Sequence, residues 1–154
     1  MYFAYGHNTD TKEFKKRIPS ASYVGIASLP DYKLSLHRWA GIERSKGSVV
    51  TGVVWHFPRE FISDLDWYEG LGREYTKKKH KVFGENGETI NVFAYEQQIK
   101  PAEPPTAQYI GWLRKGYKEH GIPQHQLNDA LSSLNLGKTN RKKATRRKSY
   151  FRHG

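Results

Sequence analysis

The chain has 154 residues, with 26 Lys or Arg against 15 Asp or Glu and no cysteine. This length suits a single domain, and the lack of cysteine excludes a disulfide framework, a thiol nucleophile and a cysteine-ligated zinc site. No apolar run approaches the roughly 20 residues of a membrane span, and strand-like sequence from Tyr2 leaves no room for a cleavable leader. We therefore expect a cytoplasmic protein with no membrane partner.

The net charge of +11 is concentrated at the C-terminal end of the chain. Residues 137–154 contain 8 Lys or Arg and no acid, and removing these 8 from the total of 26 leaves 18 basic against 15 acidic residues, a net charge of +3. The sequence thus predicts one domain over residues 1–136 and a basic tail over residues 137–154, disordered when free.

The first part of the chain is typical of short strands broken by turns. Asp10 is a suitable N-cap for a short helix that Pro19 ends, and Leu29-Pro30-Asp31 is typical of a turn between two strands. The expected strands are residues 2–6, 22–28, 33–37 and 48–57, and the expected helix is residues 11–18.

The second part begins with a helix that an apolar stripe of Phe61, Ile62, Leu65 and Tyr68 predicts and that Gly70 ends. Strands over residues 74–83 and 89–97 flank a Gly-Glu-Asn-Gly segment typical of a hairpin, and helices follow over residues 106–119 and 124–134. Strands followed by helices, without regular alternation, indicate an α+β fold: a small twisted sheet or barrel packed by short α-helices.

Two segments suggest a functional site. The aromatic run from Tyr2 to Tyr5 stops at Gly6, where main-chain N–H groups of a small polar loop can hold an anion; an ordinary turn is the alternative. Glu69 ends the helix of residues 58–69 at the border between buried and exposed surface. There, desolvation would raise its pKa towards the range of a general base; a solvated surface glutamate is the alternative.

These segments resemble the gamma-glutamylcyclotransferase family, whose members open with Tyr-Phe-Ala-Tyr-Gly-Ser-Asn and carry a glutamate in a Leu-Asp-x-x-Glu-Gly segment. Pro104 to Tyr109, Val53 to Trp55 and Gly121 to Pro123 are also similar to family motifs. The resemblance implies a compact mixed barrel surrounded by helices. It also implies a cofactor-free gamma-glutamyl cyclotransferase that releases 5-oxoproline and a free amine or amino acid from a small-molecule gamma-glutamyl substrate.

The resemblance also implies roles for individual residues. Glu69 is the expected catalytic acid–base group, with no metal ligands, and His7 stands where the family usually has serine. For Tyr109 the resemblance implies a hydrogen bond to substrate, while core packing is the alternative. The expected substrate-binding residues are Tyr2, Phe3, Ala4, Tyr5, Gly6, His7, Asn8 and Tyr109.

Two competing functions come from the basic residues and from His7. A small-barrel protein could bind nucleic acid weakly through the stretch from Arg73 to Lys81 and through the tail, where Tyr150 and Phe151 could stack on bases; a solvated tail is the simpler alternative. A non-catalytic member of the fold is the third hypothesis. The expected nucleic-acid contacts in the tail are Lys138, Arg141, Lys142, Lys143, Arg146, Arg147, Lys148 and Arg152.

Overall fold

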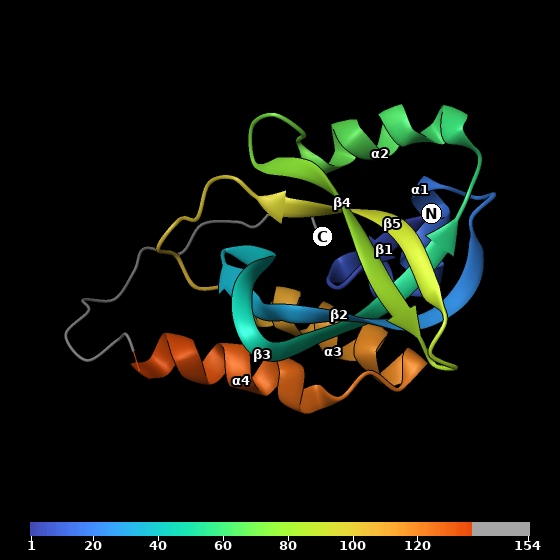
Figure 1. Cartoon of the computed structure of the whole chain (residues 1–154). Coiled ribbons are helices and arrows are strands. Elements are labelled where there is room, and N and C mark those ends of the chain that lie inside the picture. Colours follow the sequence, from blue (N-terminus) through green and yellow to red (C-terminus); the bar gives the residue numbers. More distant parts are fainter. Residues whose placement is uncertain (137–154) are drawn as a thin grey trace.

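The computed structural model describes residues 1–136, with side chains described as far as Leu134. Five strands close into a barrel (Figure 1), in which β1 pairs in parallel with β5 and the other neighbours pair antiparallel. The predicted α+β barrel is therefore confirmed. The strands, in barrel order, are β1 (Tyr2–Ala4), β3 (Trp39–His56), β2 (Ser22–His37), β4 (Tyr75–Gly84) and β5 (Thr89–Gln97).

The long hairpin of β2 and β3 differs from the sequence-based expectation. Two strands separated by a turn near Pro30 were expected, but β2 is one strand of 16 residues that pairs with β3 on both sides of that point. Asp31 adopts φ 63°, and the register shifts between Pro30 and Tyr32. The Oδ1 atom of Asp31 accepts the Gly47 N–H at 2.9 Å. The segment is thus a bulge that bends the strand rather than a turn that reverses it.

The start of β3 was also predicted too late, at residue 48 rather than Trp39. The chain reverses at Arg38, which has φ 64° and separates the paired residues His37 and Trp39. The first part of β3, residues 39–47, contains charged and polar residues and lacks the apolar run that marked residues 48–57. The sequence pattern therefore did not indicate a strand there.

The helices follow the prediction to within two residues at each end, except that α2 begins at Ile62 rather than at Pro58, because residues 59–61 form a 3-10 turn. Side-chain oxygens of Asp10 and Thr106 cap α1 and α3, and Gly70 ends α2 in the left-handed conformation. Figure 1 shows α2 on one side of the barrel and α3 and α4 on the other. The helices are α1 (Thr11–Arg17), α2 (Ile62–Glu69), α3 (Ala107–His120) and α4 (Gln124–Leu136), with short 3-10 turns η1 (His7–Thr9) and η2 (Arg59–Phe61). No helix in residues 1–136 is long and apolar enough to cross a membrane.

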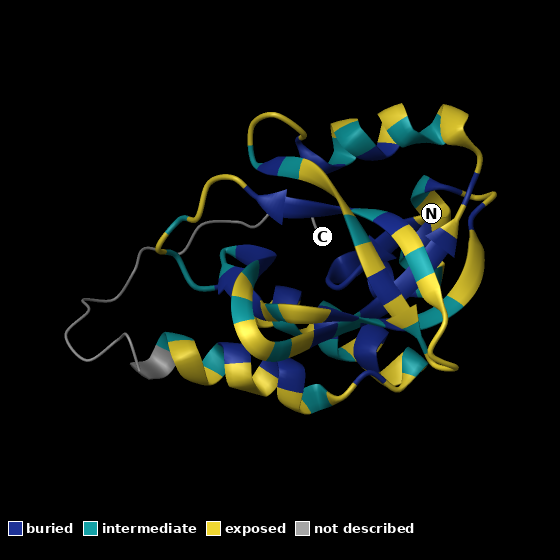
Figure 2. Ribbon diagram, in the orientation of Figure 1, coloured by how far each residue is buried: buried dark blue, intermediate teal, exposed yellow. Residues whose placement is uncertain are grey.

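The core is aromatic, and it contains many hydroxyl groups. Buried residues gather where the strands face one another and the helices (Figure 2). A buried tyrosine needs a hydrogen-bond partner for its hydroxyl, so these side chains bring polar atoms into the barrel. The largest fully buried side chains are Trp55, Tyr2, Tyr5, Tyr75, Tyr95, Tyr109 and Tyr117.

One close contact fixes the loop after β1 against α3. A Cβ added at Gly116 would lie 2.1 Å from Thr9 Oγ1 and 3.1 Å from the Asp10 nitrogen, so only glycine lets the helix approach η1 this closely. Thr9 is itself fixed, because its Oγ1 donates to the Gly6 carbonyl at 2.8 Å. The predicted basic tail, residues 137–154, lies outside the described residues.

Candidate active site

The loop after β1 turns the chain from a strand into the helix α1 within six residues, 5–10. The N–H groups of Thr9 and Asp10 donate to the carbonyls of Gly6 and His7 at 3.1 and 3.2 Å, and Asp10 Oδ1 accepts the N–H of Glu13 at 3.2 Å. These two N–H groups follow the expected anion-binding residues Gly6, His7 and Asn8 in sequence, and they close the turn that leads into α1. Gly6 has φ −120°, outside the left-handed region that favours glycine.

Glu69 lies at the C-terminal end of α2 and has no exposed surface. The helix ends immediately after it, where Gly70 (φ 72°) and Leu71 donate their N–H groups to the carbonyls of Trp67 and Asp66. The expected position at the border of the buried surface is wrong. Tyr68, expected on the apolar stripe, is half-buried, and the glutamate is the residue that α2 turns into the protein.

The charge of Glu69 affects the pKa values of five buried tyrosine hydroxyls. Burial raises the pKa of each hydroxyl, and the negative charge of Glu69 raises each pKa further. All five hydroxyls therefore stay protonated at neutral pH, and each has one proton to donate, to Glu69 or to another acceptor. These residues are Tyr2, Tyr5, Tyr75, Tyr95 and Tyr109.

Ala40 of β3 anchors two of these tyrosines through its main chain. Its N–H donates to the Tyr109 hydroxyl at 2.9 Å, and its carbonyl accepts the Tyr75 hydroxyl at 2.6 Å. Tyr109 is thus buried and hydrogen-bonded at once, so the two alternatives considered for it, packing and polar contact, do not exclude each other. A hydroxyl that accepts one bond can still donate its own proton.

Tyr5 and Tyr95 connect β1, β5 and α2. The Tyr5 hydroxyl donates to the Tyr95 carbonyl, and the Tyr95 hydroxyl donates to Asp66 Oδ1 at 2.6 Å. Asp66 also forms an ion pair with Lys77 at 2.9 Å. This network holds α2, and hence Glu69, against the barrel.

Asn8 is buried, and its side chain and its carbonyl fix the loop. Its Nδ2 donates to the Tyr2 hydroxyl at 3.0 Å, its Oδ1 accepts from Arg17 at 3.0 Å, and its carbonyl accepts the Trp55 indole N–H at 2.8 Å. Asn8 therefore links the loop to a tyrosine near Glu69.

His7 is buried and stacks on Trp112 of α3, with ring centroids 4.7 Å apart. Burial, together with the nearby charge of Arg17, lowers the pKa of His7 to about 4. The imidazole is thus neutral at neutral pH, and the histidine in place of the family serine acts as an aromatic packing residue in this loop.

The remaining predicted residues are structural. Phe3 and Ala4 are fully buried in β1, where they pair with Val54 and Val53 of β3. Sequence reasoning missed Tyr75, Tyr95 and Arg17, which lie outside the two motifs. Their only signal is residue type, because buried tyrosine and arginine side chains bring hydrogen-bond donors with them.

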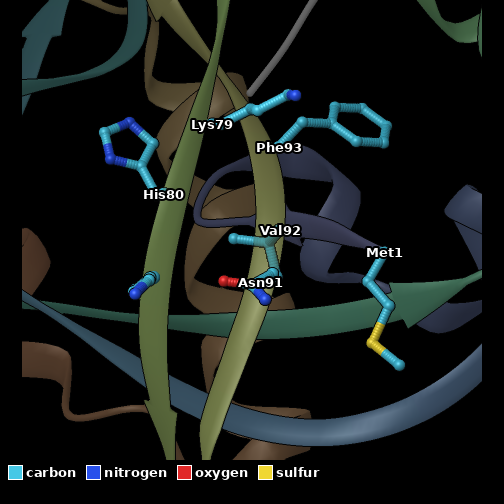
Figure 3. Close-up of a pocket in the computed structure, with 7 residues that line it drawn as sticks. Met1, Lys79, His80, Asn91, Val92 and Phe93 are labelled. Atoms are coloured by element: carbon cyan, nitrogen blue, oxygen red, sulfur yellow. The ribbon is translucent and has the colours of Figure 1, made fainter.

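Two depressions on the surface lie away from these residues. Both are lined by Met1, Lys79 and Phe93 on the outside of β4 and β5, and Figure 3 shows His80 on the opposite side of β4 from Lys79. Neither is lined by Glu69 or by the loop of residues 6–8.

Part of the basic stretch before and within β4 is neutralised locally. Lys77 pairs with Asp66, and both Lys78 and His80 contact Glu96, at 3.6 and 2.7 Å. The expected nucleic-acid contacts from Lys138 to Arg152 lie outside the described residues. Within residues 1–136, no group of three or more His, Cys, Asp or Glu side chains is arranged to hold a metal ion.

The sequence of this chain is similar to a protein family and to individual proteins of known name. A family profile described as "Gamma-glutamyl cyclotransferase, AIG2-like" matches residues 2–116. The Mus musculus protein named gamma-glutamylcyclotransferase is 36% identical over 137 aligned residues, covering 80% of this chain and 73% of that protein. The Homo sapiens protein of the same name is 33% identical over 136 residues, covering 80% and 72%.

The fold agrees with these sequence matches. A solved structure named gamma-glutamyl cyclotransferase superposes with a TM-score of 0.77 at 30% identity and covers 85% of each chain. The span matched by the family profile includes the loop after β1, Glu69 and Tyr109.

Proposed function

Because this chain belongs to the family described as gamma-glutamyl cyclotransferase, AIG2-like, we propose that it converts a gamma-glutamyl compound into 5-oxoproline and a free amine or amino acid. The observation that carries the proposal is Glu69, a fully buried carboxylate that lies in the family's glutamate segment and whose charge raises the pKa of five buried tyrosine hydroxyls. The relatives' names state the same activity.

In this reaction the α-amine of the substrate attacks the γ-carbonyl carbon of the same molecule. The new C–N bond closes a five-membered ring, and the original γ-amide C–N bond breaks. Glu69 removes one proton from the attacking amine and returns it to the departing nitrogen, so the proton balance closes. General acid–base catalysis of this kind contributes about 10²- to 10⁴-fold, and holding the two reacting atoms together can supply about 7–11 kcal/mol.

The tyrosines provide donors for the oxygen on which charge develops. When the amine attacks, the γ-carbonyl oxygen gains negative charge, and fixed donors in a site without water stabilise it. The Tyr2 and Tyr109 hydroxyls each accept a hydrogen bond, from Asn8 and from the Ala40 N–H, which orients each hydroxyl oxygen. We assign the oxyanion contact to this pair.

Substrate entry requires movement, because Glu69 has no exposed surface. Tyr68, the half-buried residue before it, lies under the guanidinium group of Arg17, 4.1 Å from the ring centroid. We infer that these two side chains form the boundary that a substrate displaces, after which the site closes and excludes water.

A release assay for 5-oxoproline tests the proposal. The purified chain is incubated with gamma-glutamyl amino acids, gamma-glutamyl amines and glutathione, and 5-oxoproline is measured by mass spectrometry. We expect release from at least one class at a rate far above the spontaneous reaction. No release from any of the three classes would contradict the proposed function and favour a non-catalytic member of the fold.

A further inference from the structure

Arg17, the last residue of α1, faces the same group of side chains as Glu69. Its Nη1 atom donates to Asn8 Oδ1 at 3.0 Å and to the Glu13 carbonyl at 3.1 Å. Its Nη2 atom lies 3.5 Å from His7 Nδ1, and its guanidinium carbon lies over the Tyr68 ring. One half-buried cation thus contacts the loop after β1 and the residue next to Glu69.

The charge of Arg17 is not used in an ion pair. The two lysines near it each have an acidic partner: Lys16 lies 3.1 Å from Glu13, and Lys115 lies 3.5 Å from Asp10. Within residues 1–136, no carboxylate lies within ion-pair distance of Arg17. An arginine held by three side chains, without an acid, keeps its charge for an anion. Because Nη1 already donates to Asn8 and to the Glu13 carbonyl, the contact with the anion falls to Nη2 and Nε.

The positive charge of Arg17 affects the pKa values of two neighbouring side chains, Tyr2 and His7. The positive charge of Arg17 partly offsets the rise in the pKa of Tyr2 that burial and Glu69 cause, and it contributes to the low pKa of His7. Arg17 and Glu69 therefore act on one site with opposite charges.

We propose that Arg17 binds the α-carboxylate of the gamma-glutamyl substrate while Glu69 receives the α-amine. The inference rests on the proposed function. The α-carbon of a gamma-glutamyl group carries one carboxylate and one amine, and the site offers one guanidinium and one carboxylate. Arg17 contacts Asn8 and His7 of the loop after β1, so its charge lies beside the residues expected to hold the anion.

The test compares binding of 5-oxoproline with binding of 5-oxoprolinamide, which has the same shape but no carboxylate. Isothermal titration calorimetry measures both dissociation constants for the wild-type chain and for Arg17→Gln. We expect the wild type to prefer 5-oxoproline by about 10- to 100-fold, because charge-assisted hydrogen bonds contribute roughly 1.5–3 kcal/mol. Arg17→Gln should reduce this preference to below about threefold, and Arg17→Lys should retain part of it.

Arg44→Gln is the matched control. Arg44 also lies over a tyrosine ring, that of Tyr32 at 5.5 Å, but on the β2–β3 hairpin, so its loss should leave the preference unchanged. If Arg17 only stabilised the loop, Arg17→Gln would weaken both ligands equally and the preference would persist. That result, or a wild type without any preference, would overturn the inference.

Kinetics separate this inference from the proposed function. With gamma-glutamyl-alanine, Arg17→Gln should raise KM by about 10-fold or more while kcat changes little, since the anchor acts in both ground and transition states. With the same compound carrying an α-carboxamide, the variant and the wild type should have similar KM values. If the wild type releases 5-oxoproline and Arg17→Gln has an unchanged KM, the role of Arg17 is wrong but the proposed function stands. If the wild type releases no 5-oxoproline, the proposed function itself is contradicted.

Discussion

Glu69 shows how a single residue can be costly for folding and useful for chemistry. An ionised carboxylate without exposed surface is strongly unfavourable unless polar groups surround it. The tyrosines near Glu69 supply such groups, and their own pKa values rise in response. Replacing the carboxylate with a neutral group of the same shape therefore removes the acid–base function without leaving a cavity.

Glu69→Gln should lower kcat for 5-oxoproline release by at least about 100-fold and change KM little, because the amide keeps the shape but cannot accept the proton. Steady-state kinetics on the best substrate of the panel measures both constants. Glu60→Gln, which removes an exposed carboxylate from η2, is the control and should behave as wild type. A Glu69→Gln rate above about a tenth of wild type would rule out a general base of the expected strength.

His7 should make the stability of the chain depend on pH. Its pKa is about 4 in the folded chain against about 6.5 when unfolded, so between these values the unfolded state binds a proton that the native state excludes. The free energy of unfolding should therefore fall as the pH drops from about 6.5 towards 4.

The variant His7→Ser lacks this proton uptake and also loses the stacking contact with Trp112. At pH 7.5 we expect the variant to be less stable than wild type by about 1 kcal/mol or more. At pH 5 the wild type should have lost about 2 kcal/mol relative to the variant, since 1.36 kcal/mol corresponds to one pKa unit, so a difference of about 1 kcal/mol should change sign. Denaturant unfolding at the two pH values measures this, and a difference that does not change with pH would contradict the assignment.

The two motifs were readable from the sequence, but the environment of each residue was not. The glutamate was found because it lies in a short motif that ends a helix. The tyrosines on which its charge acts, among them Tyr75, Tyr95 and Tyr109, come from two strands and a helix. Local sequence patterns cannot show that these side chains lie near one another, because they come together only when the barrel closes. The low pKa of His7 was hidden for the same reason, since Trp112 belongs to α3.

At the scale of elements, the helices were predictable because their ends carry local chemical signals. Asp10 and Thr106 cap the starts of α1 and α3, and Gly70 ends α2. The β2–β3 hairpin was not predictable in the same way, because Pro30-Asp31 has the composition of a turn and the structure uses it as a bulge. Whether such a segment reverses the chain depends on the partner strand, here through the Asp31–Gly47 hydrogen bond.

The contact between α3 and η1 gives a prediction at this scale. Gly116→Ala should destabilise the chain by about 1–3 kcal/mol, because the added Cβ would lie 2.1 Å from Thr9 Oγ1. Since Thr9 bonds to Gly6, the displaced loop should also raise KM for a gamma-glutamyl substrate. Thermal unfolding and steady-state kinetics measure the two effects.

Gly111→Ala on the same helix is the matched control. A Cβ at Gly111 has no neighbour within 4 Å, so the change should stabilise the helix by up to about 1 kcal/mol and leave KM unaffected. Equal effects of the two substitutions would show that helix propensity, rather than the approach of α3 to the loop, determines the result.

At the scale of the whole molecule, the charge is divided unevenly between two parts of the sequence. Residues 1–136 carry 18 basic and 15 acidic residues, and residues 137–154 carry 8 basic residues and no acid. Within the described part, several β4 cations already have acidic partners, among them Lys77 with Asp66 and Lys78 with Glu96. Any general affinity for polyanions should therefore reside mainly in the last 18 residues.

Deleting residues 137–154 should leave 5-oxoproline release and the melting temperature nearly unchanged, because the family match ends at residue 116 and the deleted sequence has few apolar residues to bury. The deletion should remove most binding to nucleic acid, because the eight cations that would neutralise phosphates are lost. Fluorescence anisotropy with duplex and single-stranded oligonucleotides, at a low and a moderate salt concentration, measures the affinity.

The dependence of nucleic-acid affinity on salt concentration tests whether residues 137–154 bind nucleic acid. Counterion release makes log K fall with log salt in proportion to the number of phosphates contacted, so the full-length chain should show a steep slope that becomes shallow after truncation. If the full-length chain has no affinity even at low salt, the nucleic-acid hypothesis is wrong and the tail is a solvated extension. If truncation instead abolishes 5-oxoproline release, residues 137–154 contribute to the catalytic domain, and the predicted boundary at residue 136 is wrong.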